Sequence, residues 1–154
     1  MCAFVLDTNI WDVLAVDELA RSRICELSGA GVLEVIVPAT VRRELQLSPL
    51  AGVPAWFPTR VVGDSVFVLD VTPLGEGALG EGSAYAEHLG DSEQRADAII
   101  IDTTDTSGAT FISADNRARK RYARMRDDSC SIDYQRFRAD VLEIEARPPN
   151  SGWS

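Results

Sequence analysis

The sequence predicts an α/β fold: a three-layer α/β/α sandwich in which helices cover both faces of a mostly parallel β-sheet. Short apolar runs alternate with longer segments of helical pattern along most of the chain, which is the order that a parallel sheet requires. With 154 residues, 45% of them hydrophobic and 25% charged, the chain is suited to one domain with a full core. We expect residues 1–146 to form this domain and residues 147–154 to be a loose C-terminal tail.

The predicted strands are short apolar runs of the kind that is buried in a parallel sheet. Pro38 closes the second strand, and Gly108 leads into the fourth. From the N-terminus, the strands are expected at Phe4–Leu6, Leu33–Val37, Val66–Val71, Ala109–Ser113 and Ser131–Asp133.

The predicted helices lie between these strands and after the last one. Thr8 is expected to cap the first helix, and the stretch 29–31, with two glycines, ends the second. Prolines within residues 49–58 break the chain into a loop after the third helix. The helices are expected at Asn9–Val16, Glu18–Ser28, Ala39–Leu47, Ser83–Leu89, Asp91–Thr106, Asn116–Met125 and Tyr134–Glu145.

The cysteines and the apolar runs bear on the compartment of the protein. Cys2, Cys25 and Cys130 form no CxxC pair, so reduced thiols are favoured over a disulfide framework or a zinc site. No apolar run is long enough to span a bilayer, and the N-terminus lacks the basic and apolar regions of a secretory signal. We therefore expect a cytoplasmic protein that does not enter a membrane.

Acidic residues follow the ends of predicted strands. Asp7 and Asp115 come directly after the first strand and the strand 109–113, and Glu44 lies about two turns into the helix after the second strand. The carboxyl ends of parallel strands meet at one edge of the sheet, where ligands bind, so these acids can converge. Converging carboxylates stay ionised only beside a cation, and oxygen ligands suit Mg²⁺ or Mn²⁺. Such a cation supports phosphodiester hydrolysis without a protein nucleophile. The alternative is that these aspartates are ordinary helix caps.

Four short segments, in the right order, resemble the PIN-domain family of VapC-like ribonucleases. The match extends over most of the chain, to about Glu145. The segments are FVLDTN at 4–9, REL at 43–45, DAII at 97–100 and FISAD at 111–115.

The resemblance implies a PIN-like fold, a Mg²⁺ or Mn²⁺ cofactor and hydrolysis of RNA phosphodiester bonds. The residues that it identifies as catalytic, metal-binding acids are Asp7, Glu44, Asp97 and Asp115. The polar groups that would orient these acids are Thr8, Asn9 and Ser113. Many family members of this size are toxins that an antitoxin protein inhibits, and they often form homodimers.

The chain departs from the family's usual pattern in two segments. Residues 48–82 are rich in proline and glycine, where such toxins usually carry a helical hairpin that binds the antitoxin. The third acid is followed by polar residues where small apolar ones are usual. Of these, Asp105 lies roughly on the face of Asp97 and could add a ligand. We expect instead that Asp102 and Asp105 are solvated helix charges.

A basic segment begins two residues beyond Asp115. Because the chain has a net charge of −9, it is a poor polyanion binder over its surface as a whole, and the location of the positive charge matters more than the sum. We expect this segment to bind RNA phosphates; the alternative is a solvated helix face. Its residues are Arg117, Arg119, Lys120, Arg121 and Arg124.

Three other functions are alternatives to an RNA hydrolase. A non-catalytic PIN-like binding module and a DNA-directed nuclease of the same fold both stay open. A phosphatase of the haloacid-dehalogenase type is disfavoured, because Asn9 stands where that family needs a second aspartate. That family also needs a lysine ahead of its last acids, and the only lysine, Lys120, follows Asp115.

Overall fold

A computed structural model of the chain describes residues 1–55, 57–62, 95–125 and 130–144. The side chains of residues 61, 62, 95–98, 106 and 125 are also outside the description. Three predictions fall on residues that are not described: the strand Val66–Val71, the helix Ser83–Leu89 and the C-terminal tail 147–154.

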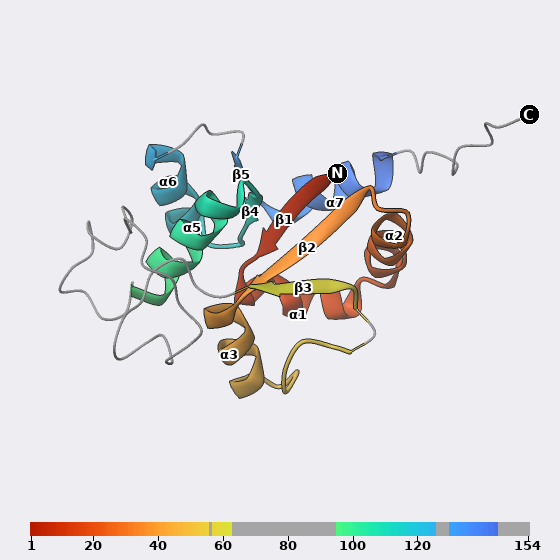
Figure 1. Cartoon of the computed structure of the whole chain (residues 1–154), viewed down its shortest axis with the longest axis horizontal. Helices are drawn as coiled ribbons and strands as arrows, with labels where there is room; N and C mark the ends of the chain where they lie inside the picture. Colours follow the sequence, from red (N-terminus) through yellow and green to blue (C-terminus); the bar gives the residue numbers. More distant parts are fainter. Residues whose placement is uncertain (56, 63–94, 126–129, 145–154) are drawn as a thin grey trace, which may run out of the picture.

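The described strands form one five-stranded sheet in which every neighbouring pair is parallel, in the order β3-β2-β1-β4-β5 (Figure 1). The chain builds the sheet outward from β1 in one direction and then returns to the other side of β1. The order of the strands therefore reverses between β1 and β4. The strands are β1 (Cys2–Leu6), β2 (Leu33–Pro38), β3 (Thr59–Val62), β4 (Thr110–Ile112) and β5 (Ser131–Ile132).

Strand β3 lies at the edge of the sheet and was not predicted. It has four residues and directly follows Pro58, so its sequence resembles the end of a proline-rich loop. Pairing with β2 brings Arg60 beside Glu34, and the guanidinium Nε lies 2.6 Å from the carboxylate Oε1. The neighbouring strand, rather than an apolar run, therefore defines this element.

The described helices agree with the predicted ones to within two residues at each end that is described. For α3 and α6 the predicted ends are the observed ones. None of the helices in the described part of the chain has both the length and the apolar character needed to cross a membrane. The helices are α1 (Thr8–Val16), α2 (Glu18–Gly29), α3 (Ala39–Leu47), α5 (Arg95–Ser107), α6 (Asn116–Met125) and α7 (Tyr134–Glu143).

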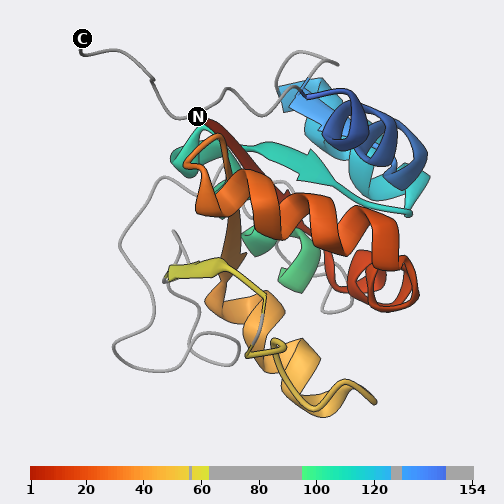
Figure 2. The same ribbon diagram turned by 90° about the vertical axis from the view of Figure 1, so that its right-hand side faces the viewer.

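Aromatic contacts show that α6 and α7 cover opposite faces of the sheet. Phe4 of β1 packs edge-on against Phe137 of α7, with ring centroids 5.1 Å apart, and Phe111 of β4 stacks on Tyr122 of α6 at 5.7 Å. Phe111 is paired with Val5, the neighbour of Phe4, and successive side chains of a strand point to opposite faces. Helices α1 and α2 lie with α7, whereas α5 packs on the other face (Figures 1 and 2). The predicted layers of an α/β/α sandwich are thus present.

The first helix begins one residue earlier than predicted, and its cap is Asp7 rather than Thr8. Asp7 has an extended backbone, and its Oδ1 accepts a 2.8 Å hydrogen bond from the Thr8 N–H. A carboxylate directly before the helix satisfies a backbone donor that would otherwise be unpaired. The Thr8 side chain is therefore available for a contact elsewhere.

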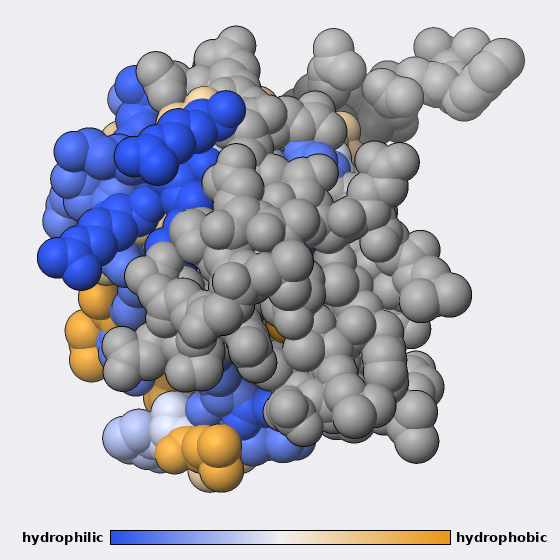
Figure 3. All heavy atoms as spheres, turned by 90° about the vertical axis from the view of Figure 1, so that its left-hand side faces the viewer, coloured by the Kyte–Doolittle hydropathy of each residue, from blue (hydrophilic) through white to orange (hydrophobic). Residues whose placement is uncertain are grey.

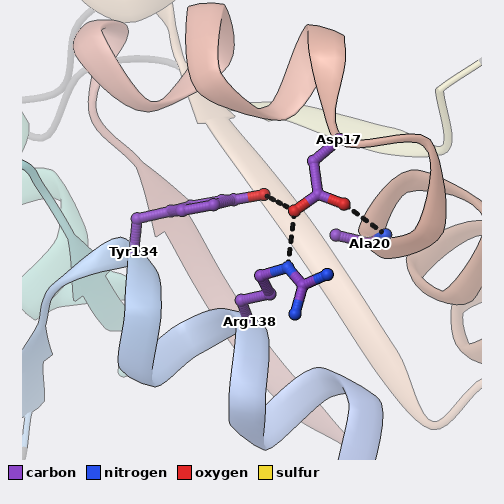
Figure 4. Close-up of polar contacts among 4 residues, drawn as sticks. All are labelled: Asp17, Ala20, Tyr134 and Arg138. Carbon is purple, nitrogen blue, oxygen red and sulfur yellow. Dashed lines mark hydrogen bonds and ion pairs between the residues drawn. The ribbon is translucent and has the colours of Figure 1, made fainter.

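Asp17, between α1 and α2, connects these helices to α7 through hydrogen bonds (Figure 4). Its Oδ1 accepts from the Ala20 N–H at 3.1 Å, and its Oδ2 accepts from the Tyr134 hydroxyl at 2.8 Å and from Arg138 Nε at 2.7 Å. Burial alone would raise the pKa of Asp17, but these hydrogen bonds outweigh it and lower the pKa below its ordinary value. This acid is thus a structural contact between the helices of one layer.

Candidate functional site

The candidate site lies where the strand order reverses. Asp7 follows β1, and its N–H donates to the Ile112 carbonyl of β4 at 2.9 Å, so the two strands stay paired up to the site. The helices that follow these strands, α1 and α6, go to opposite faces of the sheet. In open α/β sheets this divergence leaves a crevice beyond the carboxyl ends of the two strands, which is where ligands bind.

Asp7 is a buried carboxylate that accepts hydrogen bonds from three donors. It is 7% exposed, and Ser113, which lies beside it, is fully buried. The Ser113 hydroxyl and Asn9 Nδ2 donate to Asp7 Oδ2 at 2.6 and 3.2 Å, while the Thr8 N–H donates to Oδ1. Burial raises the pKa of Asp7, these hydrogen bonds oppose the rise, and the negative charge of Asp115 adds to it. The ionised form of Asp7 is therefore costly without a nearby positive charge.

Ser113 connects the acid after β1 to the acid after β4. Its hydroxyl oxygen accepts from the Asp115 N–H at 3.0 Å while donating to Asp7. Its carbonyl accepts from the guanidinium of Arg119, one turn into α6. The next residue is also fixed, because the Ala114 N–H donates to Asn9 Oδ1 at 3.1 Å. The loop between β4 and α6 is thus tied to the beginning of α1.

Asp115 has the capping role that the sequence left open. Its Oδ1 accepts from the Arg117 N–H at 2.7 Å, at the first turn of α6. The residue is exposed to solvent, and its negative charge raises the pKa of Asp7. Capping α6 leaves other lone pairs of this carboxylate available, because an ionised carboxylate has about four acceptor positions.

Glu44 reaches the site through Thr8. The Thr8 hydroxyl donates to Glu44 Oε2, while the Thr8 N–H donates to Asp7. One residue at the start of α1 therefore holds two of the predicted acids. The structure brings Asp7, Glu44 and Asp115 to the same edge of the sheet, as the sequence predicted.

Asp97, the fourth predicted acid, lies in the first turn of α5, and its side chain is outside the described residues. Helix α5 ends at Ser107 and β4 begins at Thr110, so the helix runs antiparallel to the strand. Its first turn is accordingly at the carboxyl edge of the sheet, on the face that α6 covers (Figure 1).

The donors at the site have the chemistry that a hard divalent cation requires, although they do not by themselves form a closed cage. No three Asp, Glu, His or Cys side chains in the described part of the chain are arranged to enclose a metal ion. Asp7 accepts three hydrogen bonds, which leaves about one of its acceptor positions for a further ligand. An all-oxygen set with a buried, electrostatically strained carboxylate fits Mg²⁺ or Mn²⁺ rather than zinc.

Helix α5 buries several polar residues. The prediction that Asp102 is a solvated helix charge was therefore wrong. Asp102 is 6% exposed, and Asp105 is partly buried. The hydroxyls of Thr103 and Thr104 donate to the carbonyls four residues earlier, at 2.8 and 2.7 Å. These threonines satisfy their own polar groups inside the helix, so a polar sequence is compatible with burial.

The predicted basic residues on α6 divide into two groups. Arg117, Lys120 and Arg124 are exposed, whereas Arg119 and Arg121 are partly buried. The contact of Arg119 with the Ser113 carbonyl was not foreseen. Its position four residues after Asp115, on the inward side of the helix, is the only signal that the sequence offers for it.

The resemblance to PIN-domain ribonucleases rests on four short motifs and on their order along the chain. Three of these motifs supply side chains that the structure brings together, and the fourth lies at the start of α5. Compared with known proteins, the chain matches no protein-family model, no curated protein and no solved structure.

Proposed function

We propose that this chain is a Mg²⁺- or Mn²⁺-dependent endoribonuclease with a PIN-like fold, which hydrolyses RNA phosphodiester bonds. The observation that carries the proposal is the buried Asp7 carboxylate at the strand-order reversal. Ser113 and Asn9 hold it, Asp115 acts on it through its charge, and Thr8 links it to Glu44. The residues proposed to hold the cation are Asp7, Glu44, Asp97 and Asp115.

The electrostatics of Asp7 support a cation at this position. A buried carboxylate beside a second negative charge is unfavourable in its ionised form, and a bound cation reverses that preference. When bound, Mg²⁺ or Mn²⁺ supplies positive charge that activates water and stabilises the charge developing on the phosphoryl group.

The surrounding residues act by orienting the acids. Ser113 is fully buried, and its hydroxyl both donates to Asp7 and accepts from the Asp115 N–H, so it is committed to positioning and is a poor nucleophile. Thr8 fixes Glu44 relative to Asp7. Hydrogen bonds of this kind hold a ligand's orientation and contribute to the affinity for the metal.

The resemblance adds a biological setting to the proposal. The enzyme would be the toxin of a toxin–antitoxin pair, bound by its antitoxin protein and assembled as a homodimer. These assignments rest on the four motifs alone.

A second candidate function is supported by the capping contacts. Asp7 caps α1 and Asp115 caps α6, so both acids have a structural role without any cation. A non-catalytic binding module of the same fold would keep these residues for that reason.

Cleavage assays separate the candidates. Labelled RNA and DNA are incubated with the protein in Mg²⁺, in Mn²⁺ or in EDTA. The variant is Asp7→Asn, and the matched control is Asp12→Asn, which makes the same change on the exposed side of α1. We expect RNA cleavage that needs the cation, disappears in Asp7→Asn and persists in Asp12→Asn. Cation-dependent cleavage of DNA alone would establish a DNA-directed nuclease, and no cleavage of either polymer by the folded protein would favour the binding module.

A further inference from the structure

Helix α6 has one face that packs on the sheet and one that carries positive charge to solvent. Ala118 and Tyr122 are 2% exposed, and Tyr122 stacks on Phe111 of β4. Arg117, Lys120 and Arg124 are exposed and stand three and four residues apart, which places them on one side of the helix. We call these three residues the α6 basic stripe.

The positive charge of the α6 basic stripe is not neutralised within the described part of the molecule. Ion pairs between described residues involve other arginines, such as Arg60 with Glu34 and Arg136 with Asp140. None of them involves the side chains of the stripe. The stripe is therefore a local positive surface on a chain whose net charge is −9. In Figure 3, the described residues at the upper left of the face on which α6 lies are mostly hydrophilic.

The stripe begins at the candidate site. The Arg117 N–H donates to Asp115 Oδ1, so the first turn of α6 lies beside an acid of the candidate site. Helix α6 then runs back along the sheet to β5, and seven residues of helix carry the stripe about 10 Å from Arg117 to Arg124. A phosphate backbone that reaches the candidate site can therefore continue along α6 past the exposed side chains of the stripe.

We propose that the α6 basic stripe binds successive phosphates of a single RNA strand that lies with one phosphate at the acids of the candidate site; this rests on the proposed ribonuclease function. A narrow stripe about 10 Å long can follow one flexible strand. Recognition of an RNA duplex, by contrast, takes contacts across two successive minor grooves, which is more than a stripe about 10 Å long can span. The three side chains would hold the backbone without selecting the base sequence.

The test is a binding measurement that does not depend on cleavage. A short fluorescently labelled single-stranded RNA is titrated with the full chain in EDTA, and the Kd is followed from about 50 to about 200 mM salt. The variant is Lys120→Gln/Arg124→Gln, which spares Arg117 beside Asp115. The matched control is Arg60→Gln/Arg136→Gln, which removes the same charge from exposed arginines of β3 and α7.

We expect the α6 variant to raise the Kd and to lower the slope of log Kd against log salt by about 0.7 per lost contact, or about 1.4 in all. The control should keep the wild-type slope. Equal slopes in the two double variants would overturn the proposal, and so would binding of duplex RNA as tight as that of the single strand.

The two proposals can fail separately. Cation-dependent RNA cleavage, together with equal slopes of log Kd against log salt in the two double variants, would support the ribonuclease proposal and contradict RNA binding by the stripe. A lower slope in the α6 variant of a protein that cleaves no RNA would establish the stripe as an RNA-binding surface of a non-catalytic module.

Discussion

The Ser113 hydroxyl donates a 2.6 Å hydrogen bond to Asp7 Oδ2 and so joins two side chains that are 106 residues apart in the sequence. This bond spans the boundary between β1 and β4, where the chain changes direction within the sheet. The geometry of the candidate site therefore depends on correct pairing of these two strands.

Replacing Ser113 by alanine should weaken both the site and the fold. The change removes the shorter of the two hydrogen bonds to the buried Asp7 Oδ2 and takes the Ser113 acceptor from the Asp115 N–H. Losses of this kind at a buried group typically cost about 1–3 kcal/mol in the free energy of unfolding. Losses of this kind around a metal ligand also reduce cation affinity or activity by about 10–100-fold. Urea unfolding and the Mg²⁺ dependence of RNA cleavage test both effects, with the exposed Ser22→Ala as control. Wild-type Mg²⁺ dependence in Ser113→Ala would contradict the positioning role.

The raised pKa of Asp7 predicts how stability changes with pH in EDTA. Burial is its main cause, so the folded protein keeps this proton to a higher pH than the unfolded chain does. Protons are then lost first from the unfolded state, and the free energy of unfolding falls as the pH rises between the two pKa values. Asp7→Asn has no such proton, so its stability relative to wild type should rise over that acidic interval and then level off. Parallel curves of unfolding free energy against pH for the two proteins would refute this.

Arg119 and Lys120 are neighbours in the sequence and should have different effects on activity. Arg119 contacts the Ser113 carbonyl, whereas Lys120 is exposed on the α6 basic stripe. We expect Arg119→Gln to lower kcat with little change in KM, because it disturbs the loop that positions Ser113. Lys120→Gln should raise KM at moderate salt and leave kcat near the wild-type value. Steady-state cleavage of RNA by the two variants gives the comparison, and identical kinetic changes would contradict it.

The contacts of Asp17 predict a loss of stability that leaves the site intact. Asp17→Ala removes the cap of α2, worth about 1 kcal/mol, and partly exposed hydrogen bonds to Tyr134 and Arg138 that add about 1 kcal/mol. Because the pKa of Asp17 is lowered in the folded state, this stability is present above the unfolded pKa and is lost as the pH falls through the folded one. Thermal unfolding at neutral and at acidic pH, beside Asp12→Ala, measures the effect. A difference from wild type that persists unchanged at the lowest pH would count against this assignment.

Much of the fold could be predicted because its central strands are continuous apolar runs. Residues 4–6 and, apart from Glu34, residues 33–37 are buried, so their sequences contain almost no polar residue that could hide the pattern. Strand β3 was missed because it lies at the edge, where pairing with β2 replaces the apolar signal. Asp102 was placed in solvent because a polar helix sequence does not reveal that its threonines bond to their own helix.

The acids of the site could be predicted from topology, but their partners could not. Parallel strands end at one edge, so Asp7 and Asp115 had to lie near each other once β1 and β4 were neighbours. That Thr8 links Glu44 to Asp7, and that Arg119 holds the Ser113 carbonyl, depends on side-chain directions. Spacing along a sequence does not fix those directions.

Because the connection between α5 and β4 is short, the length of α5 determines where Asp97 lies relative to the site. Only Gly108 and Ala109 separate the two elements, and Gly108 has φ +65°, a left-handed conformation that glycine adopts readily, so the end of α5 lies close to the start of β4. The position of Asp97 is then measured from the base of β4 by ten residues of helix, about 15 Å. Removing a single residue from α5 would lower Asp97 by about 1.5 Å and swing it around the helix by about 100°. The number of residues in this helix is thus as much a determinant of the site as their identity.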